Sequence, residues 1–144
     1  MTTKASPSRD TSVAALRVAV VGVGGVGGVF GARLAQAGHE LHFVARGATA
    51  EALRTRGLYL ESVDGDLHLP QVAVHESAAS VGPVDVVFVA VKATQVEGVA
   101  PSLRPLIGDG TIVVPLQNGV EAATLLADVL PPASVIDGLC RVMA

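Results

Sequence analysis

The sequence has little of three features that define whole classes of protein: cysteine, aromatic residues and clustered positive charge. Its one cysteine, Cys140, excludes an internal disulfide framework and is typical of a reducing compartment, so we expect a cytoplasmic protein. Aromatic residues make up 3% of the 144 residues, so the core has to be built from Val, Leu, Ile and Ala. The formal net charge of -3, with no basic run, argues against nucleic acid as a partner.

The sequence also lacks an apolar run long enough to cross a membrane. The uncharged segment 18–32 follows three basic residues, as in a secretory signal, but a spanning helix needs about 20 residues. This segment is rich in glycine, which is a poor choice for the apolar centre of a signal peptide. We therefore expect no membrane span and no targeting signal. Residues 1–15 are expected to form a disordered leader ahead of one domain over 16–144.

Along the rest of the chain, short Val-rich runs alternate with amphipathic ones. Runs of this kind suit strands that are buried on both faces of a parallel sheet. We predict strands over 16–21, 41–45, 84–91, 111–116 and 134–139, and helices over 26–37, 49–56, 94–106 and 120–130. Weak alternation around Asp64 and Gly65 predicts a β-hairpin over 58–69. This order predicts an α/β fold, a doubly wound parallel sheet with helices on both faces.

Six glycines lie between Gly22 and Gly31, where the first predicted strand is followed by the first predicted helix. Gly22, Gly24 and Gly27 match G-x-G-x-x-G, which in a strand-turn-helix context indicates dinucleotide binding. The first glycine permits the tight turn, the second lets a pyrophosphate approach the backbone, and the third lets the helix pack closely. Free N–H groups of the first helical turn then face the phosphates. The alternative is a glycine-rich turn that packs a helix and holds no ligand.

The residue after the second predicted strand bears on the choice of cofactor. Domains that bind NAD usually carry Asp or Glu there, whereas this chain has Ala45 followed by Arg46. A guanidinium can form forked, charged hydrogen bonds with a 2′-phosphate. We expect no carboxylate near enough to repel that phosphate, because Glu40 lies at the start of the strand. The sequence therefore predicts NADP as the cofactor, with a solvated surface arginine as the alternative.

Two further polar residues follow strong predicted strands: Lys92 in VKATQ and Asn118 in LQNG. Ligands of doubly wound sheets bind beyond the carboxyl ends of the strands, so we expect both side chains at the site. Lys92 can meet a phosphate or a substrate anion, and Asn118 can hydrogen-bond a nicotinamide ribose or a carbonyl group. Each also has a plain alternative, namely a surface lysine and a turn-forming Asn-Gly pair.

Three segments taken in order, GVGGVGGVFGARLAQAGHELHFVARG, VDVVFVAVKATQ and VVPLQNGVE, resemble the N-terminal domain of the ketopantoate reductase (2-dehydropantoate 2-reductase) family. The resemblance covers residues 16–144 and implies a Rossmann-like fold. It also implies reduction of 2-dehydropantoate to pantoate with NADPH, in pantothenate and coenzyme A biosynthesis. The cofactor-binding residues that it implies are Gly22, Val23, Gly24, Gly25, Val26, Gly27, Arg46, Lys92, Asn118 and Ala144, with Asn118 also near the substrate.

In that family the catalytic lysine and a substrate-binding carboxylate belong to a helical C-terminal substrate domain, which we expect to be absent from this chain. We therefore assign no catalytic residue and no metal ligand, and we expect the chain to be inactive alone. The expected partners are a small 2-ketoacid substrate and either the missing helical domain or a second copy of the chain. Two other functions stay open: a non-catalytic NADP-binding module or sensor, and the cofactor domain of another Rossmann dehydrogenase.

Overall fold

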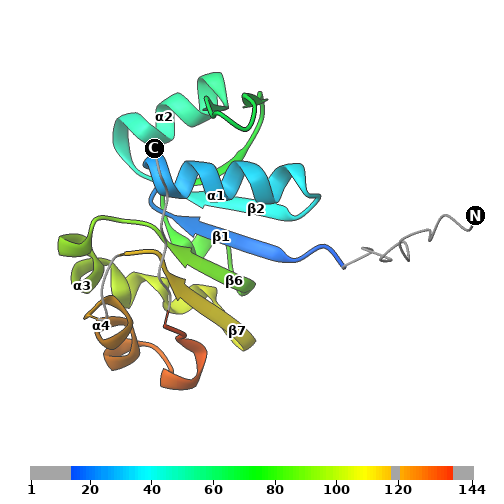
Figure 1. The fold of residues 1–144 in the computed structure, drawn as a ribbon. Coiled ribbons are helices and arrows are strands. Elements are labelled where there is room, and N and C mark those ends of the chain that lie inside the picture. Colours follow the sequence, from blue (N-terminus) through cyan, green and yellow to red (C-terminus); the bar gives the residue numbers. More distant parts are fainter. Residues whose placement is uncertain (1–13, 118–120, 138–144) are drawn as a thin grey trace, which may run out of the picture.

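The central feature of the fold is a sheet of five parallel strands in the order β5-β2-β1-β6-β7. A computed structural model describes residues 14–117 and 121–137 (Figure 1). The first strand in chain order lies in the middle of the sheet, the next two strands of this sheet lie on one side of it, and the last two lie on the other side. The strands are β1 (Arg17–Val21), β2 (Glu40–Val44), β5 (Ala73–His75), β6 (Val84–Val89) and β7 (Ile107–Pro115). The predicted doubly wound α/β fold is confirmed, and its strand order reverses between β1 and β6, where ligands of such sheets bind.

Helices cover both faces of this sheet. Figure 1 shows α1 (Gly25–Gln36) and α2 (Gly47–Arg56) on one face, with α3 (Val96–Val99) and α4 (Glu121–Val129) on the other. The predicted hairpin is present as the antiparallel pair β3 (Leu58–Leu60) and β4 (Leu67–Leu69), and it packs beside α1. Short 3₁₀ helices complete the fold: η1 (Ala78–Ser80), η2 (Ala93–Gln95), η3 (Ala100–Leu106) and η4 (Pro132–Ser134).

Alternate residues of β1 enter two separate cores, as expected for a strand covered on both faces. Val18 and Val20 pack with Phe43 beneath α1, whereas Ala19 and Val21 belong to the core beneath η3 and α4. These four residues are at most 2% exposed. Burying such a valine contributes about 1.5–3 kcal/mol, so β1 anchors both layers and fixes the position of the turn that follows it.

The prediction of a continuous α-helix over 94–106 is wrong. The segment consists of η2, one α-helical turn at α3, and η3. Pro101 lies at the start of η3 and Pro105 lies inside it. Proline has no backbone N–H and its ring clashes with the preceding turn, so neither position supports a continuous α-helix.

Two strand predictions also need correction. The predicted strand over 134–139 is not formed in the part that the structure describes, since Ser134 ends η4 and only one parallel bridge, Val113 to Val135, extends the sheet. Strand β5 was missed because its three residues are too few to show an alternating pattern. Residues 1–13, 118–120 and 138–144 lie outside the described residues. No helix within 14–117 or 121–137 is long and apolar enough to span a membrane.

Candidate functional site

The turn between β1 and α1 needs glycine at two positions for reasons of packing. Gly22 has a φ of +90°, and a Cβ there would lie 2.8 Å from the backbone nitrogen of Val91. A Cβ on Gly27 would collide with the carbonyl oxygen of Gly22 and lie 3.1 Å from Cβ of Ala90. These two glycines therefore let α1 approach the ends of β1 and β6, and they would be required whether or not a ligand binds.

Packing does not account for the glycines between them. A Cβ built on Gly24 or Gly25 meets no heavy atom within 4 Å, so both positions face open space. Gly24 is the N-cap of α1 and provides no side-chain cap. The hydrogen bond from Gly28 N–H to the Gly24 carbonyl, at 2.9 Å, is the first of the helix. The N–H groups of 25–27 precede it and have no intrahelical acceptor, so this open side of the turn is suited to an anion.

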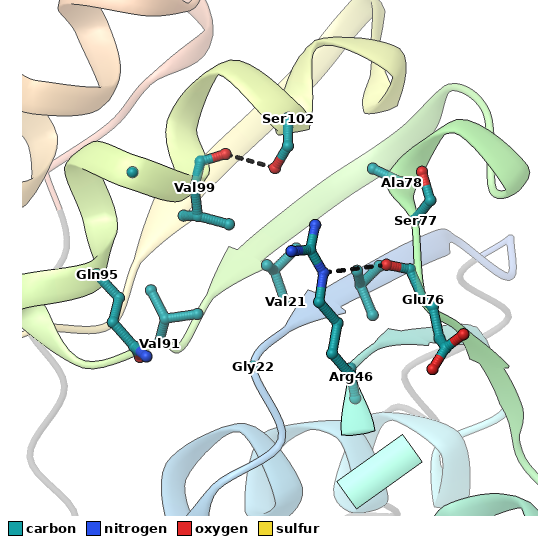
Figure 2. Close-up of a pocket in the computed structure, with 13 residues that line it drawn as sticks. Val21, Gly22, Arg46, Glu76, Ser77, Ala78, Val91, Gln95, Val99 and Ser102 are labelled. Carbon is teal, nitrogen blue, oxygen red and sulfur yellow. Dashed lines mark hydrogen bonds between the residues drawn. The ribbon is translucent and has the colours of Figure 1, made fainter. Parts of the chain in front are cut away.

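A cavity of about 370 Å³ adjoins this turn at the carboxyl ends of β1, β2, β5 and β6 (Figure 2). Its volume lies in the range of small-molecule binding sites. One wall comes from Val21 and Gly22, and a second comes from the ends of β2 and β5. The third wall comes from the segment after β6, which includes Gln95, Val99 and Ser102. The cavity is therefore a cleft beside the reversal of strand order.

Arg46 extends from the end of β2 into this cavity. Its Nε donates a hydrogen bond to the carbonyl oxygen of Glu76 at 3.3 Å, and its side chain is exposed. Figure 2 shows the guanidinium between Val21 and Glu76, facing the open part of the pocket. Among the described residues, no hydrogen bond involves the two terminal nitrogens of Arg46. These nitrogens are a fork of donors that can receive an anionic group.

A carboxylate also lines the cavity, which corrects the expectation that no acidic side chain lies near Arg46. Glu76 follows β5 directly, and the omission of that strand from the prediction concealed it. Its Oε1 lies 4.0 Å from Nη1 of Arg54, and the two side chains are 57% and 44% exposed, so this pair contributes little to stability. Figure 2 shows the carboxylate of Glu76 turned away from the Arg46 guanidinium.

Lys92 follows β6 but does not line the cavity, and its residue is exposed. Its backbone N–H donates to Oε1 of Gln95 at 3.2 Å, and the Gln95 N–H donates to the Lys92 carbonyl at 2.8 Å. Gln95 therefore lines the cavity in a fixed position. Gln95 ends the VKATQ motif and was not among the predicted site residues, although its place after a buried strand was a usable signal.

Gln117, just before Asn118, joins the segments that follow β6 and β7. It is 7% exposed, and its Nε2 donates to the carbonyl oxygens of Val89 at 2.9 Å and Val91 at 2.7 Å. Two carbonyl acceptors fix the orientation of the amide. Its Oε1 has no hydrogen-bond partner among the described residues. Gln117 therefore joins the end of β7 to the edge of the sheet where VKATQ lies, whereas Asn118 and Ala144 lie outside the described residues.

Predicted residues and residues that were not predicted lie together at this edge of the sheet. The glycine turn and Arg46 meet at one cavity, with Lys92 at the neighbouring loop. Glu76, Gln95 and Ser102 are cavity residues that the sequence analysis missed. The N–H groups of 25–27 open α1 three residues after Gly22, which lines the cavity, and the guanidinium lies at the wall formed by the ends of β2 and β5. This arrangement suits an elongated ligand that carries two separate anionic groups.

The sheet topology and the cleft at its reversal define a Rossmann-like α/β domain. A family model described as ketopantoate reductase PanE/ApbA matches residues 18–144, and the chain belongs to this family. The chain is 39% identical over 124 residues to a 2-dehydropantoate 2-reductase of Nostoc sp., covering 86% of this chain and 39% of that protein.

Solved structures give the same result. The 2-dehydropantoate 2-reductase of Porphyromonas gingivalis matches with a TM-score of 0.78 and 34% identity, over 87% of this chain and 46% of that one. The enzyme of Geobacter metallireducens matches with a TM-score of 0.74 and 30% identity, over 88% and 47%. The family resemblance inferred from the sequence is confirmed. The chain spans about two-fifths of the length of the Nostoc relative and less than half of these two solved chains.

Proposed function

We propose that this chain is the NADPH-binding part of an oxidoreductase that reduces 2-dehydropantoate to pantoate. The observation that carries the proposal is the open cradle at Gly24 and Gly25. Packing does not require glycine at these two positions, whereas the close approach of a pyrophosphate does. Membership of the ketopantoate reductase family supports the nature of the substrate, a small 2-ketoacid.

The residues of the cleft fit the proposed cofactor. The N–H groups of 25–27 would bind the pyrophosphate, and the fork of Arg46 would bind the 2′-phosphate. Gln95 and Lys92 would contact the cofactor from the segment after β6. Asn118 and Ala144 keep the roles that the family resemblance gives them. When bound, NADPH supplies a hydride, and this chain's own contribution is to bind and orient the dinucleotide.

The test of this proposal is a calorimetric titration of the 144-residue chain with NADPH and with NADH. A charged hydrogen bond to the 2′-phosphate contributes about 1.5–3 kcal/mol, so we expect NADPH to bind roughly 10- to 100-fold more tightly. Equal affinities would contradict the assignment of NADP. Failure of both nucleotides to bind would contradict the proposal.

The isolated chain is expected to have negligible 2-dehydropantoate reductase activity. The proposal assigns it only the binding of the cofactor, and the family resemblance places the catalytic lysine in a second domain. The measurement is NADPH oxidation in the presence of 2-dehydropantoate, with a full-length 2-dehydropantoate 2-reductase as the positive control. Sustained turnover by the purified chain would mean that the catalytic groups lie within these 144 residues.

A further inference from the structure

Two histidines on neighbouring strands contact each other at the edge of the sheet. His42 in β2 and His75 in β5 lie 3.0 Å apart between Nδ1 of the first and Nε2 of the second, with ring centroids 5.1 Å apart. They lie on the face opposite Leu41 and Phe43, which enter the core beneath α1. The His42 side chain is 13% exposed, so the contact is largely shielded from water.

The contact is part of a longer series of hydrogen bonds. Nε2 of His42 lies 2.8 Å from Oε1 of Glu40, and Nδ1 of His75 lies 3.0 Å from Oγ of Ser80. The Ser80 hydroxyl donates to the carbonyl oxygen of Ser77 at 2.9 Å. The series therefore runs from the start of β2, across to β5, and into the segment that connects β5 to η1.

Counting hydrogens fixes the number of protons that this series holds. Its two ends, the Glu40 carboxylate and the Ser77 carbonyl, only accept hydrogen bonds. Four links lie between them, and each link needs one hydrogen. Two neutral imidazoles and one hydroxyl supply three, so the complete series needs one additional proton on the histidine pair. With two additional protons, two N–H groups would face each other across a 3.0 Å gap.

The surrounding charges disfavour the additional proton on His75. Burial lowers the pKa of His75, and the positive charges of His42, Arg17 and Arg54 lower it further. The hydrogen bond from His42 lowers the pKa of Glu40, which keeps that carboxylate ionised beside the first ring. Arg17 also lies beside Glu40, with Nε 3.4 Å from Oε1. His75 is therefore the neutral member of the pair.

The pair lies next to the wall of the cofactor cavity. β5 is the edge strand of the sheet and pairs only with β2 within the described residues. His75 is followed by Glu76, whose carbonyl oxygen accepts the hydrogen bond from Arg46, and by Ser77, which also lines the cavity. The series thus holds the backbone that orients the guanidinium.

We propose that His42 and His75 are positioning residues for the cofactor cavity. In this arrangement, the singly protonated pair holds β5 and residues 76–78 in place, and a second proton releases them. The part that concerns NADPH rests on the proposed function. The part that concerns β5 does not.

The proposal predicts a local loss of stability on acidification. Because the pKa of His75 is lowered in the folded state from its ordinary value of 6.5, the unfolded strand binds more protons once the pH falls below that value. Because the complete series already holds one additional proton, the stabilisation is greatest near pH 6.5, where two unfolded histidines together also hold about one proton, and it decreases as the pH falls toward the lowered pKa. The amide of Ala45 reports on it, since its N–H donates to the His75 carbonyl at 2.9 Å.

The experiment is hydrogen exchange on the whole 144-residue chain at about pH 6.5 and about pH 5.0, corrected for intrinsic exchange rates. We expect the protection of the Ala45 amide to fall by about threefold or more at the lower pH. The Ala90 amide, which donates to Val21 in the middle of the sheet, is the internal reference and should change less. In His75→Gln, which is neutral at both pH values, the difference should disappear.

His68→Gln is the matched control, because His68 is an exposed histidine on the β3–β4 hairpin, and the pH effect should persist in it. If His75→Gln does not fold, ring NMR of the wild-type chain decides, since the pair must titrate in two coupled steps. Independent titration of the two rings, or an unchanged pH effect in a folded His75→Gln, would overturn the proposal.

The affinity for NADH provides the second readout. NADPH is less suitable, because the 2′-phosphate has a pKa of about 6 and its own titration would change the affinity over the same pH range. We expect acidification to weaken NADH binding by about threefold in the wild-type chain and less in His75→Gln. If acidification weakens NADH binding equally in both, His75 does not position the cavity. If no dinucleotide binds at any pH, the proposed function is wrong, while the exchange result still decides whether the pair holds β5.

Discussion

Gly24→Asp is expected to weaken NADPH binding at least about 100-fold while the free energy of unfolding stays the same or rises by a few tenths of a kcal/mol. The two effects separate because the site and the fold need different things from this position. A Cβ on Gly24 meets nothing within 4 Å, and its backbone is extended, with φ of -91° and ψ of -159°. Aspartate is also a better N-cap than glycine, and its charge favours the N-terminus of α1.

The loss of binding has two physical causes. The new side chain occupies the open side of the turn, where we propose that the pyrophosphate lies, and its carboxylate repels that group at close range. Like charges in contact cost several kcal/mol, and about 3 kcal/mol corresponds to 100-fold in affinity. Calorimetric titration measures the affinity, and urea denaturation measures the free energy of unfolding.

Gly24→Asn is the matched control, because asparagine has the same shape and caps a helix equally well. It should lose less binding than the aspartate variant, since it adds bulk without charge. Unchanged NADPH affinity in Gly24→Asp would show that the ligand does not approach this turn. Gly27 is unsuitable for this purpose, because a Cβ there collides with the Gly22 carbonyl, and a loss of binding would follow from altered packing.

The parts of the fold that the sequence predicts well are those with a dense local signal. β1 and β6 are rich in valine and lie in the middle of the sheet, and the observed bounds lie within two residues of the predicted ones. The glycine turn was predicted because steric limits on backbone approach act within a few residues. The edge strand β5 was missed because its three residues are held by pairing with β2, which lies about 30 positions earlier in the chain.

The same distinction applies to the site. Arg46 could be predicted because it follows a strand that the pattern reveals. Glu76 could not, since its place in the cavity depends on β5 and on a parallel pairing that no local pattern encodes. The histidine pair is a similar case, because His42 and His75 meet only when these two strands are in register. Contacts between distant segments therefore account for what the sequence analysis missed.

Arg46→Ala is expected to reduce NADPH affinity by about 1.5–3 kcal/mol and to leave NADH affinity nearly unchanged. The fork of donors at Arg46 is the group that we propose to bind the 2′-phosphate, which NADH lacks. The Glu76 carboxylate is turned away from the guanidinium and is present in both chains, so the difference reports mainly on the lost contact of Arg46.

Titrations of both nucleotides against the wild-type chain and the variant measure this difference. Arg56→Ala is the matched control, because Arg56 is an exposed arginine at the other end of α2 that does not line the cavity. Salt separates the local contact from the general attraction of positive charge. High ionic strength should reduce any effect of Arg56 on NADPH affinity more than it reduces the effect of Arg46. Arg56 would act at a distance, whereas Arg46 is proposed to contact the 2′-phosphate directly. Equal losses for NADPH and NADH in Arg46→Ala would mean that this arginine binds a part of the cofactor common to both.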